Sequence, residues 1–109
     1  MSVKIAALDY RSTQANLDAQ TVAINSFLST RTVTKVVVCD EYILCHYTAS
    51  PLVGLPLKVK IFNLVDAIQT NGMPATETAI SNFINSNVTG TLPQDIITLD
   101  SGVIVLVYR

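Results

Sequence analysis

Apolar and polar positions along the chain predict a strand followed by a helix. From residue 3 to residue 10 the side chains alternate as in a strand with at least one open face. From about residue 13 to residue 29 apolar residues recur three and four positions apart, which predicts one face of a helix. These apolar residues are Leu17, Ala23, Ile24, Phe27 and Leu28. Ser12 and Thr13 are the candidate N-caps, because their hydroxyls can accept an unpaired amide of the first turn.

Residues 34–48 are rich in β-branched and aromatic residues, which predicts a hairpin of residues 35–39 with residues 42–47. Asp40-Glu41 is a weak turn signal, because tight hairpin turns prefer Asn-Gly or Asp-Gly, so one long strand is the alternative. Residues 49–57 contain Pro51, Gly54 and Pro56 and are expected to be a connector, since proline disrupts central strands and helix interiors.

The second half of the chain predicts the same order of elements. Residues 57–64 form a strand pattern, and a looser stretch follows through residues 71–74. Thr76 is the candidate N-cap of a helix that runs to about Ser86 and is shorter than the first helix. After a loop at residues 87–93, residues 95–99 and 103–108 predict a hairpin, in which Gly102 can adopt the left-handed turn conformation.

Matching residues suggest that the second half is a copy of the first. Residues 79–84 repeat the apolar spacing of residues 23–28 at a shift of 56 positions, and the same shift relates the two first strands. Phe27 and Phe83 are predicted to be equivalent core residues, and Tyr47 matches Tyr108. The alternative is chance similarity between amphipathic elements. The matched pairs in the first strands are Val3 and Val59, Lys4 and Lys60, Ile5 and Ile61, and Leu8 and Leu64.

The predicted fold class is therefore α+β, an internally duplicated strand–helix–strand–strand unit with about six mainly antiparallel strands and two helices packed on the sheet. We expect one domain of two repeats, about 2–48 and about 57–109, with a linker at 49–56. We also expect an approximate two-fold axis between the copies. The pattern leaves open whether the strands form one sheet or close into a barrel.

Composition indicates a surface that is short of charge. Half of the 109 residues are hydrophobic and 14% are charged, whereas soluble domains average about 25% charged residues. Such a surface resists association poorly, which favours a homo-oligomer or a bound partner, and the alternative is a monomer with a neutral polar surface. This Thr-, Ser-, Asn- and Val-rich composition is similar to that of some phage or viral structural proteins, a similarity that involves no motif.

Charge and hydropathy exclude two classes of partner. The formal net charge is −1 and the seven basic residues are scattered, so the sequence lacks the basic cluster that nucleic-acid binding requires. The N-terminal residues carry no apolar run typical of a signal peptide, and a cytoplasmic location is expected. The longest uncharged stretch, residues 42–57, is too short and too interrupted to cross a membrane.

Cysteine, histidine and carboxylate residues cluster in residues 39–47, as in some metal and thiol sites. A two-residue hairpin turn would place Cys39 and His46 on one face and Cys45 on the other, so the thiols could neither bridge nor share an ion. An odd-numbered loop would make the two thiols diagonal neighbours, still short of the four ligands of structural zinc. We therefore predict structural cysteines, no metal site and no cofactor.

No complete catalytic constellation accompanies His46, which is the single histidine of the sequence. Its predicted neighbour across the hairpin is Lys35, and Val107 occupies its place in the second copy. We expect a half-buried strand residue and predict no catalytic residue. Asp9 and Asp66, which follow the two first strands, either face each other as a carboxylate pair or are turn residues.

Two hypotheses follow. The first is a non-enzymatic structural or assembly module that associates with itself through strand edges or a sheet face without a helix. The second is a small-molecule-binding domain or minor enzyme with a pocket between the repeats, where Tyr42, His46, Asp9 and Asp66 are the candidate lining residues.

Overall fold

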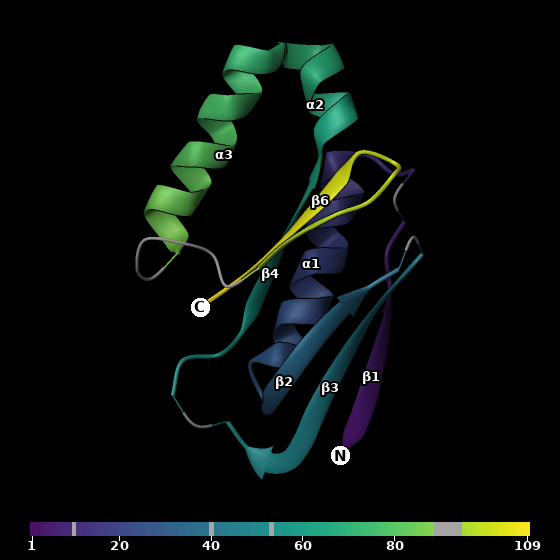
Figure 1. The fold of residues 1–109 in the computed structure, drawn as a ribbon, viewed down its shortest axis with the longest axis vertical. Coiled ribbons are helices and arrows are strands. Elements are labelled where there is room, and N and C mark those ends of the chain that lie inside the picture. Colours follow the sequence, from purple (N-terminus) through teal and green to yellow (C-terminus); the bar gives the residue numbers. More distant parts are fainter. Residues whose placement is uncertain (10, 40, 53, 89–94) are drawn as a thin grey trace.

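The computed structural model describes residues 1–9, 11–39, 41–52, 54–88 and 95–109, which contain six strands and three helices (Figure 1). The elements are β1 (Ser2–Ala7), α1 (Gln14–Leu28), β2 (Arg31–Val38), β3 (Tyr42–Pro51), β4 (Lys58–Asn63), α2 (Leu64–Asn71), α3 (Met73–Asn87), β5 (Asp95–Thr98) and β6 (Val103–Tyr108). The predicted α+β class with six antiparallel strands is confirmed.

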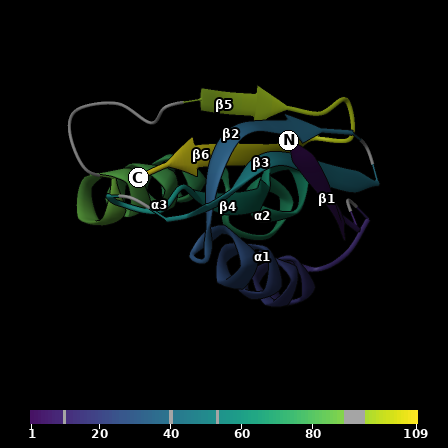
Figure 2. The same cartoon turned by 90° about the horizontal axis from the view of Figure 1, so that it is seen from below.

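The described strands form two three-stranded sheets with the same internal order. Sheet A has the order β1-β3-β2 and sheet B has the order β4-β6-β5, so the last strand of each half lies in the centre of its sheet. Figure 2 shows α1 on one side of the strands and β5 on the opposite side. The described strands thus form two separate sheets, whereas the sequence pattern left open whether they form one sheet or close into a barrel.

The hairpin of β2 and β3 has the register of a two-residue connection. Lys35 pairs with His46, and the N–H of Cys39 donates to the carbonyl of Tyr42 at 2.8 Å. The alternative of one long strand is therefore wrong; residue 40 of the expected turn lies outside the described residues. The hairpin of β5 and β6 is also confirmed, with Gly102 in its turn at a φ of 89°.

Strand β3 extends to Pro51, beyond its expected end at residue 47. The ladder between β1 and β3 ends at Tyr47, so the last residues of β3 have only β2 beside them. A proline at a strand end with one neighbouring strand removes no bond from the centre of the sheet. The first residues of the expected linker are therefore part of sheet A.

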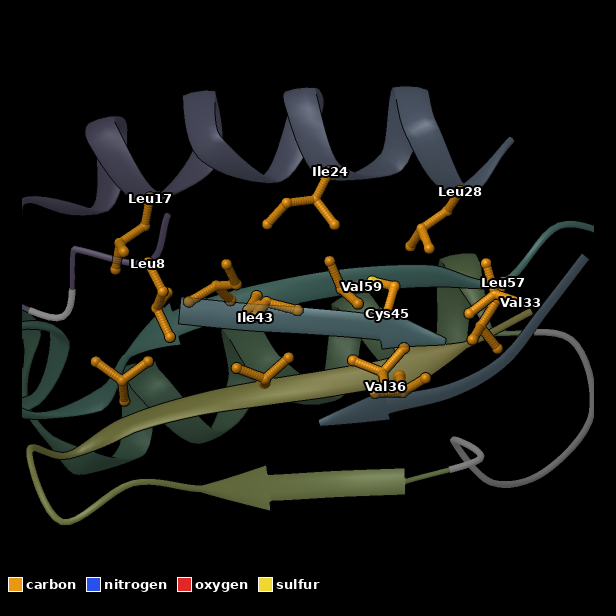
Figure 3. Close-up of a cluster of buried hydrophobic side chains, with 14 residues drawn as sticks. Leu8, Leu17, Ile24, Leu28, Val33, Val36, Ile43, Cys45, Leu57 and Val59 are labelled. Atoms are coloured by element: carbon orange, nitrogen blue, oxygen red, sulfur yellow. The ribbon is translucent and has the colours of Figure 1, made fainter. Parts of the chain in front are cut away.

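Helix α1 covers the core with one face. Its buried side chains are spaced three and four residues apart, and in Figure 3 the labelled ones point toward the strands around Ile43 and Val59. Thr13 is the N-cap, because its Oγ1 accepts a hydrogen bond from the N–H of Asn16 at 3.3 Å. The buried residues of the helix are Leu17, Thr21, Ile24 and Leu28.

Two side-chain amides of α1 are bonded to the edge of β4, and we call them the amide clamp. Asn25 donates to the carbonyl of Val59 at 3.0 Å and accepts from its N–H at 2.8 Å. Gln14 donates to the carbonyl of Ile61 at 2.7 Å and accepts from the N–H of Asn63 at 2.9 Å. A helix of the first half thereby satisfies backbone groups that a neighbouring strand would otherwise bond.

The helical part of the second half differs from its prediction. Residues 64–71, which were expected to be loose, form α2. Its N-cap is Asn63, whose side chain accepts a hydrogen bond from the N–H of Asp66 at 3.1 Å. Helix α3 begins at Met73 after Gly72 and has the same 15-residue length as α1, so a shorter second helix is wrong. Thr76 is not the N-cap, because it lies inside α3, where its hydroxyl donates to the carbonyl of Gly72 at 2.9 Å.

Three matched residues make the same contacts in both halves. Phe27 of α1 meets the ring of Tyr47 edge-on at 5.1 Å, and the Nζ of Lys4 lies 5.7 Å from the Phe27 ring centre. In the second half Phe83 meets Tyr108 edge-on at 5.5 Å, with the Nζ of Lys60 at 5.5 Å. These matching contacts support the duplication inferred from the sequence.

The two halves nevertheless pack in a non-equivalent way. The core contains the face of sheet A that carries Cys45 and Tyr47, but it contains the opposite face of sheet B, which carries Val59 and Ile61. A two-fold axis would bury equivalent faces against each other. The expected two-fold axis is therefore wrong, and the face of sheet B equivalent to the core face of sheet A packs on Phe83 of α3 instead.

Candidate functional site

Sheet A turns a largely apolar face away from the core, and we call this surface the outer face. Pairing places Val3 opposite His46, Ile5 opposite Leu44 and Val37 opposite Leu44 on that face. Val3 and Ile5 are 51% and 57% exposed. The residues of the outer face are Val3, Ile5, Ala7, Lys35, Val37, Cys39, Tyr42, Leu44 and His46.

The equivalent face of sheet B is buried. Val59 and Ile61 stand where Val3 and Ile5 stand in sheet A, and both are 0% exposed. The partner of Ile61 across the ladder, Val105, occupies the place of Leu44 and is also 0% exposed. One repeat thus buries a face that the other repeat leaves open.

The structure places Tyr42 and Asp9 at one surface hollow of about 320 Å³, beside Arg11. Asp66 lies at a second hollow of about 410 Å³, which Arg11 also lines. His46 is half-buried on the outer face, opposite Lys35 and Val3. The four candidate residues therefore do not line one of these hollows together.

The two aspartates have local structural roles. Asp9 forms a turn in which its carbonyl accepts from the N–H of Ser12 at 2.9 Å and its side chain accepts from the N–H of Arg11 at 3.3 Å. Asp66 lies in the first turn of α2, where a carboxylate is favourable against the helix dipole. These contacts fit the turn interpretation of the pair.

The two cysteines lie on opposite faces of sheet A, as the even register predicts. Cys39 is exposed on the outer face and Cys45 is buried in the core, and both are free thiols. Burial raises the pKa of the Cys45 thiol, because desolvation disfavours the thiolate. Within the described residues, no three side chains of His, Cys, Asp or Glu gather closely enough to hold a metal ion.

Sequence reasoning missed Gln14 and Asn25, the residues of the amide clamp. The available signal, for Asn25 alone, was an asparagine within a helix, where this residue is unfavourable unless its side chain bonds elsewhere. It also missed that the face of Val59 and Ile61 in sheet B is buried while the equivalent face of sheet A is partly exposed, because both faces are apolar in the sequence.

No protein-family model, curated protein or solved structure matches the chain. None of the helices in the described ranges has the length and apolar character needed to cross a lipid bilayer.

Proposed function

We propose that this protein is a non-enzymatic structural or assembly module that associates with further copies of itself through sheet A. The observation that carries the proposal is the outer face, whose Val3 and Ile5 are about half exposed while Val59 and Ile61 on the equivalent face of sheet B are fully buried. In sheet B the same kind of face is therefore buried within the chain, whereas in sheet A it is partly exposed.

Burial of the outer face would be favourable. Fully burying an aliphatic side chain contributes about 1.5–3 kcal/mol. Covering the exposed half of such a side chain with a partner would therefore contribute about 1 kcal/mol to association. Tyr42, which is 52% exposed, adds aromatic area of the kind enriched at protein interfaces. The charge content of 14% leaves little electrostatic repulsion between copies.

The test is the molar mass in solution, measured by light scattering over a wide range of protein concentration. We expect a mass of more than one chain that approaches a defined multiple. Because the contact is mainly apolar, raising the salt concentration should leave the oligomer intact, whereas an electrostatic contact would weaken. A single-chain mass at every concentration would overturn the proposal.

A second candidate function is the binding of a small polar molecule at the hollow between the halves. That hollow is lined by Arg11, Asn63, Asp66 and Ser101, and the Oγ of Ser101 is buried without a hydrogen-bond partner among the described residues. A ligand should raise the melting temperature in a dose-dependent way, and Ser101→Ala should reduce the shift. Tyr42→Ala, at the other hollow, is the matched control and should leave the shift unchanged.

A further inference from the structure

Strands β1 and β4 are equivalent edge strands whose backbones alternate in the same phase. The N–H of Leu8 donates to the carbonyl of Glu41 at 2.8 Å, and the N–H of Leu64 donates to the carbonyl of Gly102 at 2.9 Å. Successive residues of an antiparallel strand turn their N–H and C=O groups to opposite sides. The odd-numbered residues of both strands therefore direct their backbone groups away from the central strand.

On β4 the amide clamp bonds the outward N–H and C=O of Val59, the C=O of Ile61 and the N–H of Asn63. On β1 the corresponding residues are Val3, Ile5 and Ala7. Across the described ranges of the chain, no hydrogen bond reaches their outward N–H and C=O groups. The chain covers one of two equivalent edges and leaves the other open.

The open edge has one of the usual protective features, a single charged side chain, and lacks others. Its ladder with β3 has no register shift, and the strand SVKIAA contains no proline. Its single charged residue, Lys4, lies over Phe27 on the core side. A hollow of about 300 Å³ runs between β1 and α1, lined in part by Ala6 and Ala23, and leaves room for side chains of another strand.

We propose that β1 pairs antiparallel with β1 of a second copy, with the two-fold axis at Ile5, so that sheet A continues across the pair as a six-stranded sheet. The pairing rests on the proposed self-association and adds the β1 edge to the contact, beside the outer face. In this register Val3 lies opposite Ala7 of the second copy, and about six backbone hydrogen bonds form between outward groups.

Charge and side-chain direction favour this register. It places Lys4 opposite Ala6 of the second copy, whereas an axis at Lys4 would place two ammonium groups opposite each other. The Ile5 side chains of both copies meet on the outer face, where each Val3 faces Ala7 of the other copy, so the pairing covers part of this apolar face. Because two short strands bury less than the roughly 800 Å² per partner of a standard interface, we expect a concentration-dependent dimer.

The test compares Ile5→Lys with Ile96→Lys in the full chain. Ile5 is 57% exposed on the β1 edge and Ile96 is 53% exposed on the β5 edge, so the same change is made at two matched edge positions. We expect Ile5→Lys to raise the dimer dissociation constant at least tenfold and Ile96→Lys to leave it unchanged, because an edge lysine blocks strand pairing.

Amide hydrogen exchange of the unmodified protein tests the same surface without a substitution. The N–H groups of Val3, Ile5 and Ala7 should gain protection as concentration rises, whereas those of Lys4 and Ala6 are bonded within sheet A at all concentrations. If the mass increases while the first three amides stay unprotected, or if Ile5→Lys associates like the wild type, the β1 pairing is wrong and self-association stands. A wild-type protein that remains a single chain removes both proposals.

Discussion

The amide clamp allows a quantitative prediction. Asn25→Ala removes both hydrogen bonds between α1 and the backbone of Val59, at 2.8 and 3.0 Å. Val59 is 0% exposed, so its N–H and C=O groups stay inside the protein after the substitution. The variant therefore loses two bonds and leaves two polar backbone groups poorly solvated.

Two net hydrogen bonds account for about 2 kcal/mol, and incomplete solvation of the Val59 groups adds about 1–2 kcal/mol. Alanine is the better helix former and returns about 0.5 kcal/mol. We expect a loss of about 3 kcal/mol, a large fraction of the roughly 5–15 kcal/mol that stabilises a domain. The partly buried Asn25 is therefore expected to contribute as much to the free energy of unfolding as a core residue does.

Urea unfolding followed by circular dichroism measures this loss. At a slope of about 1.5 kcal/mol per molar urea, 3 kcal/mol lowers the midpoint by about 2 M. The control is Asn16→Ala in the same helix, whose side chain donates an exposed hydrogen bond of 2.8 Å to the Ser12 hydroxyl, and this change should cost less than about 1 kcal/mol. Equal midpoints for the two variants would refute the role of the clamp.

Two further predictions concern the turn of sheet B and buried ionisable groups. Gly102→Ala should lower the melting temperature far more than Gly54→Ala: both glycines have positive φ, but a Cβ at residue 102 would collide with Val65 and one at residue 54 meets nothing. Burial raises the pKa values of Cys45 and Tyr108 above their ordinary 9.0 and 10.0, so the folded state holds these protons more tightly. The unfolding free energy should therefore fall as the pH rises beyond 9, and Tyr108→Phe should flatten the part of the fall above pH 10.

Local chemistry made much of the fold predictable from the sequence. Thr13 is followed by apolar residues at helical spacing, and the structure uses it as the N-cap of α1. A two-residue turn between β2 and β3 implies an even register, and the hairpin has this register, with Cys39 and Cys45 on opposite faces. The turn of the second hairpin uses Gly102 at a positive φ, so this glycine made the second hairpin easier to predict than the first.

The missed elements had competing signals. The Asn63-x-x-Asp66 spacing caps α2, yet this helix buries no residue completely and so has a weak apolar pattern. Thr76 resembled a cap, but Gly72 and Pro74 start the helix earlier, because proline is favoured in a first turn.

Packing between the halves could not be derived from the repeat. Equivalent faces have equivalent residues, so Val3 and Val59 look alike in the sequence while one is exposed and the other buried. The candidate residues Asp9 and Asp66 were paired on the assumption of a two-fold axis, and that symmetry is absent from the described packing. The proposed interaction surface depends on this asymmetry.

The amide clamp also affects when the chain can complete its core during synthesis. Its bonds join residues 34 to 49 positions apart, from α1 to β4. During synthesis the first half leaves the ribosome earlier, but α1 packs against β4, so its buried face is completed only after β4 emerges. The first half alone would expose the core face of sheet A around Ile43, and the second half alone would expose both the edge of β4 and the apolar face of Val59. Gene truncation from either side should therefore be destabilising, because the C-terminal strand β6 is the central strand of sheet B and its Val105 belongs to the same core as Ile43 of the first half.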